Sequence, residues 1–191
     1  MKNRIIAAFE NDNLEHCENI TYSQIHVIDL SRSTNSAQNI KIYDTQPEGM
    51  ATLLIENPNL DITATFFKPQ CFLNEHGKEP DNCEGVFYLS DSTKETWILF
   101  LEIKDCNKGN ISIYFKDAKK QIISTVKIFR DKKIITESKR VYANVSFPRV
   151  GKMIFFNHFI KQPEKKKFLD DYNIFIRGTN RLVIKNNTTI Y

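Results

Sequence analysis

The chain has 191 residues, of which 41% are hydrophobic and 26% charged, and its formal net charge is +4. This composition is that of one folded globular domain and excludes an intrinsically disordered chain. No apolar run approaches the roughly 20 residues of a membrane-spanning helix, and a charge interrupts the start of the chain too early for a secretory signal. We therefore expect a cytoplasmic protein with no membrane partner.

In the first half of the chain, β-branched and alternating residues predict strands within 20–30 and 39–43, separated by a Ser/Asn-rich loop at 31–39. A further strand is predicted at 61–67. Residues 74–82 are almost all turn-forming and predict a loop.

The clearest pattern begins at residue 85. Two apolar, β-prone runs at 85–89 and 96–103 are joined by the polar turn 90–95 and predict a β-hairpin. After a break at 105–110, apolar residues recur every three or four positions, which predicts an amphipathic helix. They are Ile111, Phe115, Ala118, Ile122, Val126 and Phe129.

The last quarter of the chain predicts a strand at 140–147, ended by Pro148. Residues 172–177 and 181–185 flank Gly178-Thr179-Asn180 and predict a second, C-terminal β-hairpin. Between these elements Lys165–Lys167 is a short basic run, which is typical of a solvated turn.

Strand alternation places Glu102 and Lys104 on one side of the 96–103 strand, with Ile98 and Phe100, while Leu101 and its neighbours face the other side. A hairpin turn centred near residue 93 pairs residues whose numbers sum to about 186. Glu84 then lies opposite Glu102. Two facing carboxylates are unfavourable unless a cation or another partner compensates them, and a divalent cation with oxygen ligands would do so.

These residues give the chain a resemblance to the PD-(D/E)xK superfamily of metal-dependent nucleases, which includes restriction-endonuclease-like and RecB-type members. The E-x-K tripeptide is Glu102-Ile103-Lys104, and the second acidic residue is Glu84, with Asp81 of Pro80-Asp81 as the alternative. The resemblance implies a Mg²⁺ or Mn²⁺ ion bound by Glu84 (or Asp81), Glu102 and the main-chain carbonyl of Ile103. It implies that Lys104 acts on the attacking water or the phosphate.

In the following helix, Gln121 and Thr125 resemble the RecB-type pattern of a glutamine followed four positions later by a small or aromatic residue, so Gln121 joins the predicted catalytic set. The implied fold is α/β (α+β), with a central mixed β-sheet flanked by helices. Its restriction-endonuclease-like core spans about 61–147 of a single domain, with 1–60 and 148–191 as elaborations and an extra C-terminal β-hairpin.

The expected function is hydrolysis of phosphodiester bonds in DNA, or in RNA, in bacterial defence or a mobile element, with a possible homodimer or partner protein. Two alternatives remain: a catalytically degenerate nuclease-like binding subunit, and a β-rich interaction domain without a helix at 111–129. The E-x-K string also occurs at Glu137–Lys139 and Glu164–Lys166, and the copy at Glu102 could form a plain salt bridge pointing into water.

The four cysteines, Cys17, Cys71, Cys83 and Cys106, have irregular spacings without a C-x-x-C pair and predict free thiols. One alternative is a metal site built from Cys71, His76 and Cys83, although the paired spacing of structural zinc sites is missing.

Overall fold

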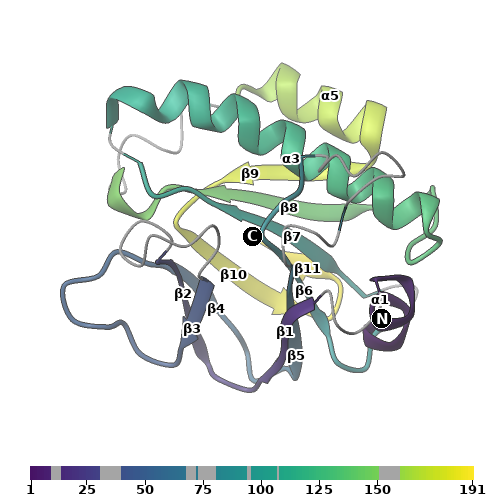
Figure 1. The fold of residues 1–191 in the computed structure, drawn as a ribbon, viewed down its shortest axis with the longest axis horizontal. Helices are drawn as coiled ribbons and strands as arrows, with labels where there is room; N and C mark the ends of the chain where they lie inside the picture. The colour runs from purple at the N-terminus through teal and green to yellow at the C-terminus, as the bar shows by residue number, and fades with distance from the viewer. Residues whose placement is uncertain are drawn as a thin grey trace.

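The computed structural model describes residues 1–9, 14–30, 40–67, 72, 81–93, 96–106, 108–150 and 160–191. Within these ranges the chain forms three layers, with helices on one face of a six-stranded sheet and a five-stranded sheet against its other face (Figure 1). The predicted α+β class, with a central mixed sheet flanked by helices, is confirmed.

The six-stranded sheet contains the predicted hairpin at its centre. Its strands lie in the order β1 (Leu14–Ile20), β5 (Ile62–Phe67), β6 (Gly85–Leu89), β7 (Ile98–Ile103), β8 (Val141–Ser146) and β9 (Ile174–Gly178). Neighbours from β1 to β7 are antiparallel, whereas β7, β8 and β9 run parallel to one another. The carboxyl ends of β7, β8 and β9 therefore meet at one edge of the sheet.

The five-stranded sheet has the order β11 (Thr189–Ile190), β10 (Arg181–Asn186), β4 (Leu53–Glu56), β2 (Gln24–Asp29) and β3 (Ile40–Tyr43). The predicted strand at 20–30 is divided, because Ile20 ends β1 in one sheet and Gln24 begins β2 in the other. Sequence patterns did not reveal β1, whose residues are mostly polar, or β4, which is only four residues long.

Three α-helices lie in the described ranges: α1 (Lys2–Phe9), α3 (Ile111–Asp131) and α5 (Gln162–Tyr172), with short 3-10 turns at Lys108–Asn110 and Pro148–Val150. All six apolar residues of the predicted stripe are buried in α3. The predicted turn at Lys165–Lys167 is wrong, since these lysines lie within α5. None of the described helices has the length and apolar character that crossing a membrane requires.

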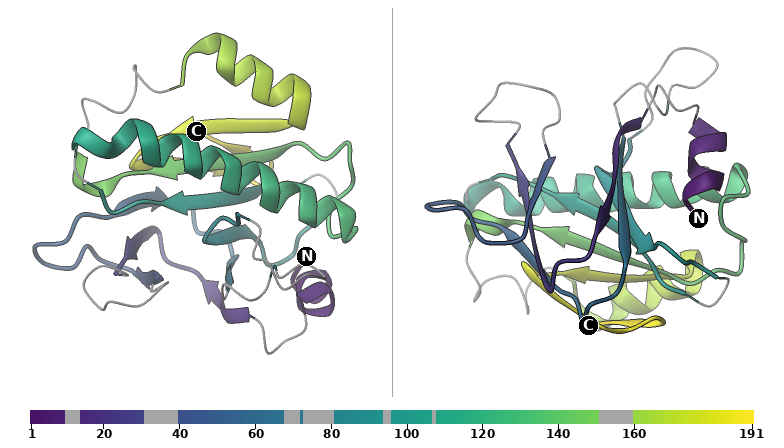
Figure 2. Two further views of the ribbon diagram at one scale, coloured as in Figure 1. Left: turned by 45° about the horizontal axis from the view of Figure 1, so that its top comes forward. Right: turned by 90° about the horizontal axis from the view of Figure 1, so that it is seen from below.

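Two hydrophobic cores lie on opposite faces of the central sheet. Figure 2 shows the ribbon of this sheet from two further sides. Phe100 packs on the side of α3, while Leu99 and Leu101 pack between the two sheets. The predicted alternation along β7 is therefore confirmed, and both of its faces are buried. The predicted register is confirmed too, because Gly85 pairs with Leu101 and Tyr88 with Ile98.

The predicted pairing of 172–177 with 181–185 is wrong. Strand β9 pairs with β8, while β10 crosses to the other sheet and pairs with β4 and β11. The side chain of Asn144 on β8 donates to the Thr179 carbonyl (2.9 Å), and Asn180 accepts from the main-chain N–H of Phe147 (2.9 Å). These bonds hold the connection against β8, so the C-terminal hairpin is formed by β10 and β11.

The main chain at Gly85 is packed closely against β5. A Cβ atom at this position would lie 2.7 Å from the Phe66 ring and 3.0 Å from the Thr65 carbonyl. We expect Gly85→Ala to lower the free energy of unfolding by about 1–3 kcal/mol in urea denaturation, because the core must shift to accept the methyl group. Gly109→Ala is the matched control, since a Cβ there meets nothing within 4 Å; equal effects at the two positions would contradict this packing.

Candidate active site

Glu84, Glu102 and Lys104 meet at one end of the β6–β7 hairpin. Glu84 immediately precedes β6, Glu102 is the penultimate residue of β7, and Lys104 follows that strand. Because the hairpin has the predicted register, the two glutamates face each other across the ends of their strands. The structure thus brings together the three residues that sequence reasoning grouped.

The two glutamates are held by reciprocal hydrogen bonds to the main chain. The N–H of Glu84 donates to Oε2 of Glu102 (3.1 Å), and the N–H of Ile103 donates to Oε2 of Glu84 (3.0 Å). The Lys104 ammonium forms an ion pair with Oε1 of Glu102. Each carboxylate therefore binds the opposite strand, and neither side chain is free to turn away.

The three charged groups are withdrawn from water. Glu102 is 0% exposed and Glu84 9% exposed, and the Lys104 side chain is 22% exposed. A salt bridge pointing into water, the plain alternative for the E-x-K tripeptide, is therefore wrong. Two carboxylates against one ammonium leave this group with an excess negative charge when both are ionised, and burial makes that charge costly.

Burial is the largest cause that raises the pKa of both glutamates. It raises the pKa of Glu102 from 4.5 to about 7, although the Lys104 ammonium partly opposes the effect. It raises the pKa of Glu84 well above its usual value, and the charge of Glu102 raises it further. For Lys104, burial lowers the pKa, but the two glutamates together raise it more. The cluster therefore favours holding an extra proton or another cation near neutral pH.

Sequence reasoning missed Asp29, the last residue of β2. Its charge raises the pKa values of Glu84, Glu102 and Lys104, so it lies within electrostatic reach of all three. Asp29 belongs to the other sheet. The local sequence showed only a strand that ends with an acid, because the packing of the two sheets decides which residues that end approaches.

Helix α3 anchors the segment that leads into Glu84. Thr125 is fully buried, and its hydroxyl accepts the main-chain N–H of Cys83 (2.8 Å) and donates to the carbonyl of Gln121 (2.8 Å). The Gln121 side chain donates to the carbonyl of Asn82 (3.1 Å). Gln121, predicted as catalytic, thus reaches the open end of the hairpin as expected, but its hydrogen bond positions the main chain two residues before Glu84.

Asp81, the alternative to Glu84, is exposed. Of the two candidates for the second acidic residue, it is therefore Glu84 that has buried contacts with the end of β7 that carries Glu102. Cys83 is buried with a free thiol, while Cys71 and His76 lie outside the described residues.

A cleft of about 560 Å³ lies at the end of β7, where Ile103 lines it; Glu84, Glu102 and Lys104 are not among its described lining residues. Its lining includes Asp29, the β7 terminus at Ile103, and an ion pair in which the Arg149 Nε atom lies 2.7 Å from Oδ1 of Asp105. Arg149 follows β8, so the cleft lies at the carboxyl ends of the parallel strands. This is the kind of place where open α/β sheets bind ligands.

The carboxylate and carbonyl oxygens at this site suit a hard cation such as Mg²⁺, which prefers oxygen ligands. Both Oε2 atoms accept main-chain hydrogen bonds, and Oε1 of Glu102 already pairs with the Lys104 ammonium. A cation would therefore contact Oε1 of Glu84 and share Oε1 of Glu102 with Lys104. The described residues contain no cluster of three or more His, Cys, Asp or Glu side chains placed to hold a metal. The protein would therefore supply two carboxylates and the Ile103 carbonyl, and water or substrate would complete the coordination.

Comparisons of the chain with models of protein families, with curated proteins and with solved structures find no match.

The raised pKa of Glu102 predicts a dependence of stability on pH. The folded protein keeps this proton up to about pH 7, whereas the unfolded chain loses it near the usual pKa of 4.5. The folded state therefore loses stability as the pH rises from about 4.5 to about 7. The Glu102→Gln variant has no titrating group at this position. Its free energy of unfolding, relative to that of the wild type, should therefore rise by up to about 3 kcal/mol as the pH increases over this range.

Chemical denaturation at several pH values measures this difference. Glu137→Gln is the control, since that side chain is 81% exposed and belongs to another E-x-K copy. A constant difference between Glu102→Gln and the wild type at every pH would contradict the assignment.

The bond from Cys83 to Thr125 predicts a second effect on stability. Thr125→Val keeps the shape of the side chain but leaves a buried N–H without its acceptor, so we expect a loss of about 1–3 kcal/mol in the free energy of unfolding. Ser124→Ala, the neighbouring position on α3, is the control and should change stability by less than about 0.5 kcal/mol. Urea denaturation of both variants measures this, and equal losses would argue against an anchoring role for Thr125.

Proposed function

We propose that this protein is a metal-dependent nuclease of the PD-(D/E)xK type that hydrolyses phosphodiester bonds. The observation that carries the proposal is the buried group of Glu84, Glu102 and Lys104, held by reciprocal main-chain bonds at the end of neighbouring strands. A protein gains little stability from burying two carboxylates with one ammonium, so a functional use for a cation is the better explanation.

Each residue has a distinct part in the proposed reaction. Glu84, Glu102 and the Ile103 carbonyl would hold the ion, and the charge of Asp29 increases the attraction for it. A magnesium ion held by these residues would polarise the scissile phosphate and lower the pKa of a bound water. The Lys104 ammonium, which is already next to Glu102, would orient the attacking water or stabilise the charge that develops on phosphorus.

The adjoining cleft supports a nucleic-acid partner. Arg149 is 58% exposed at the lining of this cleft and could contact a phosphate while keeping Asp105 as its partner. The proposal includes DNA rather than RNA as the substrate and a cytoplasmic location, which suits the free thiols of Cys17 and Cys83.

A second candidate is a nuclease-like binding protein without catalysis. It is favoured by the Lys104 contact, because this ammonium already satisfies the Glu102 oxygen that a metal would need. Under this candidate the cluster would be a structural ion group, and the protein would bind nucleic acid without cleaving it. The third alternative, a β-rich interaction domain, predicts no helix at 111–129. Helix α3 spans Ile111–Asp131, which argues against this alternative.

The proposal predicts cleavage of DNA that requires Mg²⁺ or Mn²⁺. Glu102→Gln should lower the cleavage rate by at least about 100-fold, because it removes a charged metal ligand, and Lys104→Ala should do the same by removing a transition-state contact. Cleavage of labelled single- and double-stranded DNA, and of RNA, with and without EDTA, measures these rates.

Glu137→Gln is again the control and should retain full activity. Undiminished magnesium-dependent cleavage by a double Glu102→Ala, Lys104→Ala variant would refute the nuclease assignment. Binding without cleavage by the wild type, together with a melting temperature that Mg²⁺ does not change, would favour the second candidate.

A further inference from the structure

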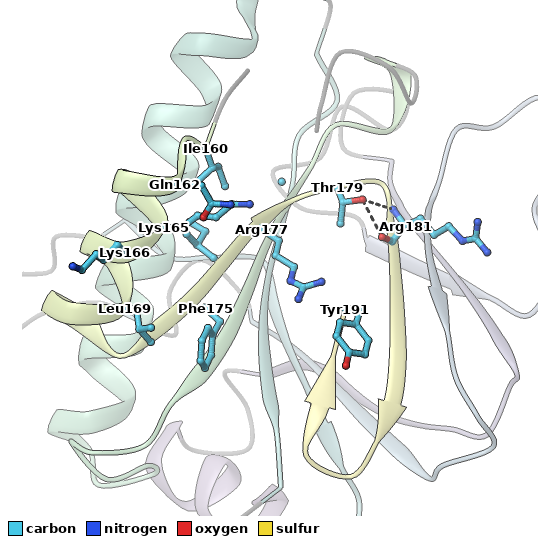
Figure 3. A pocket seen from close by; sticks show the side chains of 12 residues that line it. Ile160, Gln162, Lys165, Lys166, Leu169, Phe175, Arg177, Thr179, Arg181 and Tyr191 are labelled. Carbon is cyan, nitrogen blue, oxygen red and sulfur yellow. Dashed lines mark hydrogen bonds between the residues drawn. The ribbon is translucent and has the colours of Figure 1, made fainter. Parts of the chain in front are cut away.

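A second pocket, of about 460 Å³, lies over β9 between α5 and the β10–β11 hairpin (Figure 3). Helix α5 contributes Lys165 and Leu169 to its lining, and the opposite side contributes Tyr191. Its volume lies within the range of cavities that bind small molecules. None of the residues assigned above to the nuclease site lines this pocket.

The pocket is positively charged. Four cationic residues line it and no aspartate or glutamate is among its described lining residues; the four are Lys165, Lys166, Arg177 and Arg181. The Arg181 guanidinium forms an ion pair with Glu56. By contrast, no carboxylate in the described part of the chain forms an ion pair with Arg177, although this side chain is half-buried. An anion could therefore pair with Arg177 without displacing a protein carboxylate.

Aromatic rings flank this arginine. Figure 3 shows the Arg177 side chain extending between Phe175 and Tyr191. Its Cζ atom lies 5.8 Å from the centre of the Tyr191 ring, and the Lys185 ammonium lies 5.5 Å from the same ring. Tyr191 is 52% exposed, so a planar ligand can approach this residue from solvent. Cations beside a partly exposed aromatic ring suit a ligand that carries both a phosphate and a base.

We propose that this pocket binds a nucleoside phosphate, with Arg177 and Lys165 contacting the phosphate and Tyr191 stacking on the base. Arg177 presents a planar set of N–H donors that matches phosphate oxygens. The ligand is either a free nucleotide or one nucleotide of a single strand. The assignment depends on residues outside the glutamate cluster and does not require the nuclease proposal.

The pocket and the glutamate cluster lie near the same edge of the central sheet but involve opposite faces of it. Gly178 of the pocket pairs with Val145 on β8, and Ser146 of β8 pairs with Ile103 on β7. Two strand spacings, or about 10 Å, therefore separate β9 from the strand that carries Glu102. Asn144 pairs with both Arg177 and Leu101, so Arg177 lies on the face of the sheet opposite to Glu102, and the two sites can be tested separately.

Binding measured in EDTA separates this site from cleavage. The probes are thymidine 5′-monophosphate, inorganic phosphate, and a fluorescein-labelled oligothymidylate of about ten nucleotides, a length near the usual size of single-strand sites. We expect Arg177→Gln to weaken binding of the nucleotide and the oligonucleotide by about tenfold or more, because a charge-assisted contact is lost. Tyr191→Ala should weaken binding of both by about fivefold or more and change phosphate binding by less than about twofold.

Lys116→Gln is the charge-matched control, since Lys116 is exposed on α3 and does not line the pocket. Equal Kd values for Arg177→Gln and Lys116→Gln, or no binding of the nucleotide and oligonucleotide probes at millimolar concentration, would overturn the proposal. Should Arg177→Gln lower the melting temperature, Lys165→Gln provides the same comparison from α5. Tight binding of the mononucleotide identifies a free nucleotide as the ligand, and Arg177-dependent binding of the oligonucleotide alone identifies a strand.

Discussion

The site depends on one reciprocal interaction, in which Glu84 and Glu102 each accept a main-chain N–H from the end of the other's strand. These bonds extend the β6–β7 ladder beyond its last paired residues with side-chain oxygens in place of carbonyls. Two carboxylates are thereby kept close together where repulsion and burial would otherwise separate or neutralise them. Lys104 and Asp29 then set the charge of the group, the first by contact and the second from the other sheet.

The layers of the fold make this interaction possible and also make it costly. The hairpin has a helix-packed core on one side and a sheet-packed core on the other, so the ends of its strands are shielded from water on both faces. Thr125 and Gln121 on α3 hold the main chain that enters β6. The helix therefore stabilises the fold and also places Glu84, and a substitution on α3 can alter the site without touching a carboxylate.

The crossing from β9 to β10, at the last strand of the same sheet, has a comparable effect. Asn144 and Asn180 bind this connection to β8, so that β10 leaves for the second sheet and the β10–β11 hairpin stands opposite α5. The pocket around Arg177 is formed by this separation. Had β9 and β10 paired as a hairpin, Tyr191 would not face the lysines of α5 across a gap.

Local periodicity was enough to predict the hairpin, its register, the buried stripe of α3 and the meeting of Glu84, Glu102 and Lys104. Each of these depends on residues close in sequence, where the two-residue repeat of a strand or the 3.6-residue repeat of a helix determines which side chains share a face. The same reasoning failed for α5, for β1 and β4, and for the partners of β9 and β10, whose pairings join distant segments.

Asp29 and the Arg177 pocket lay equally beyond the reach of sequence patterns. Local sequence does not predict which distant residues lie close in space to a strand that ends with an acid, or to a basic run near the end of the chain. Only the packing of the second sheet on the first decides that Asp29 approaches the glutamates, and only the crossing after β9 decides that Tyr191 lies beside Arg177. The local repeats selected the residues of the hairpin site, whereas contacts between distant segments decided its electrostatics and the second pocket.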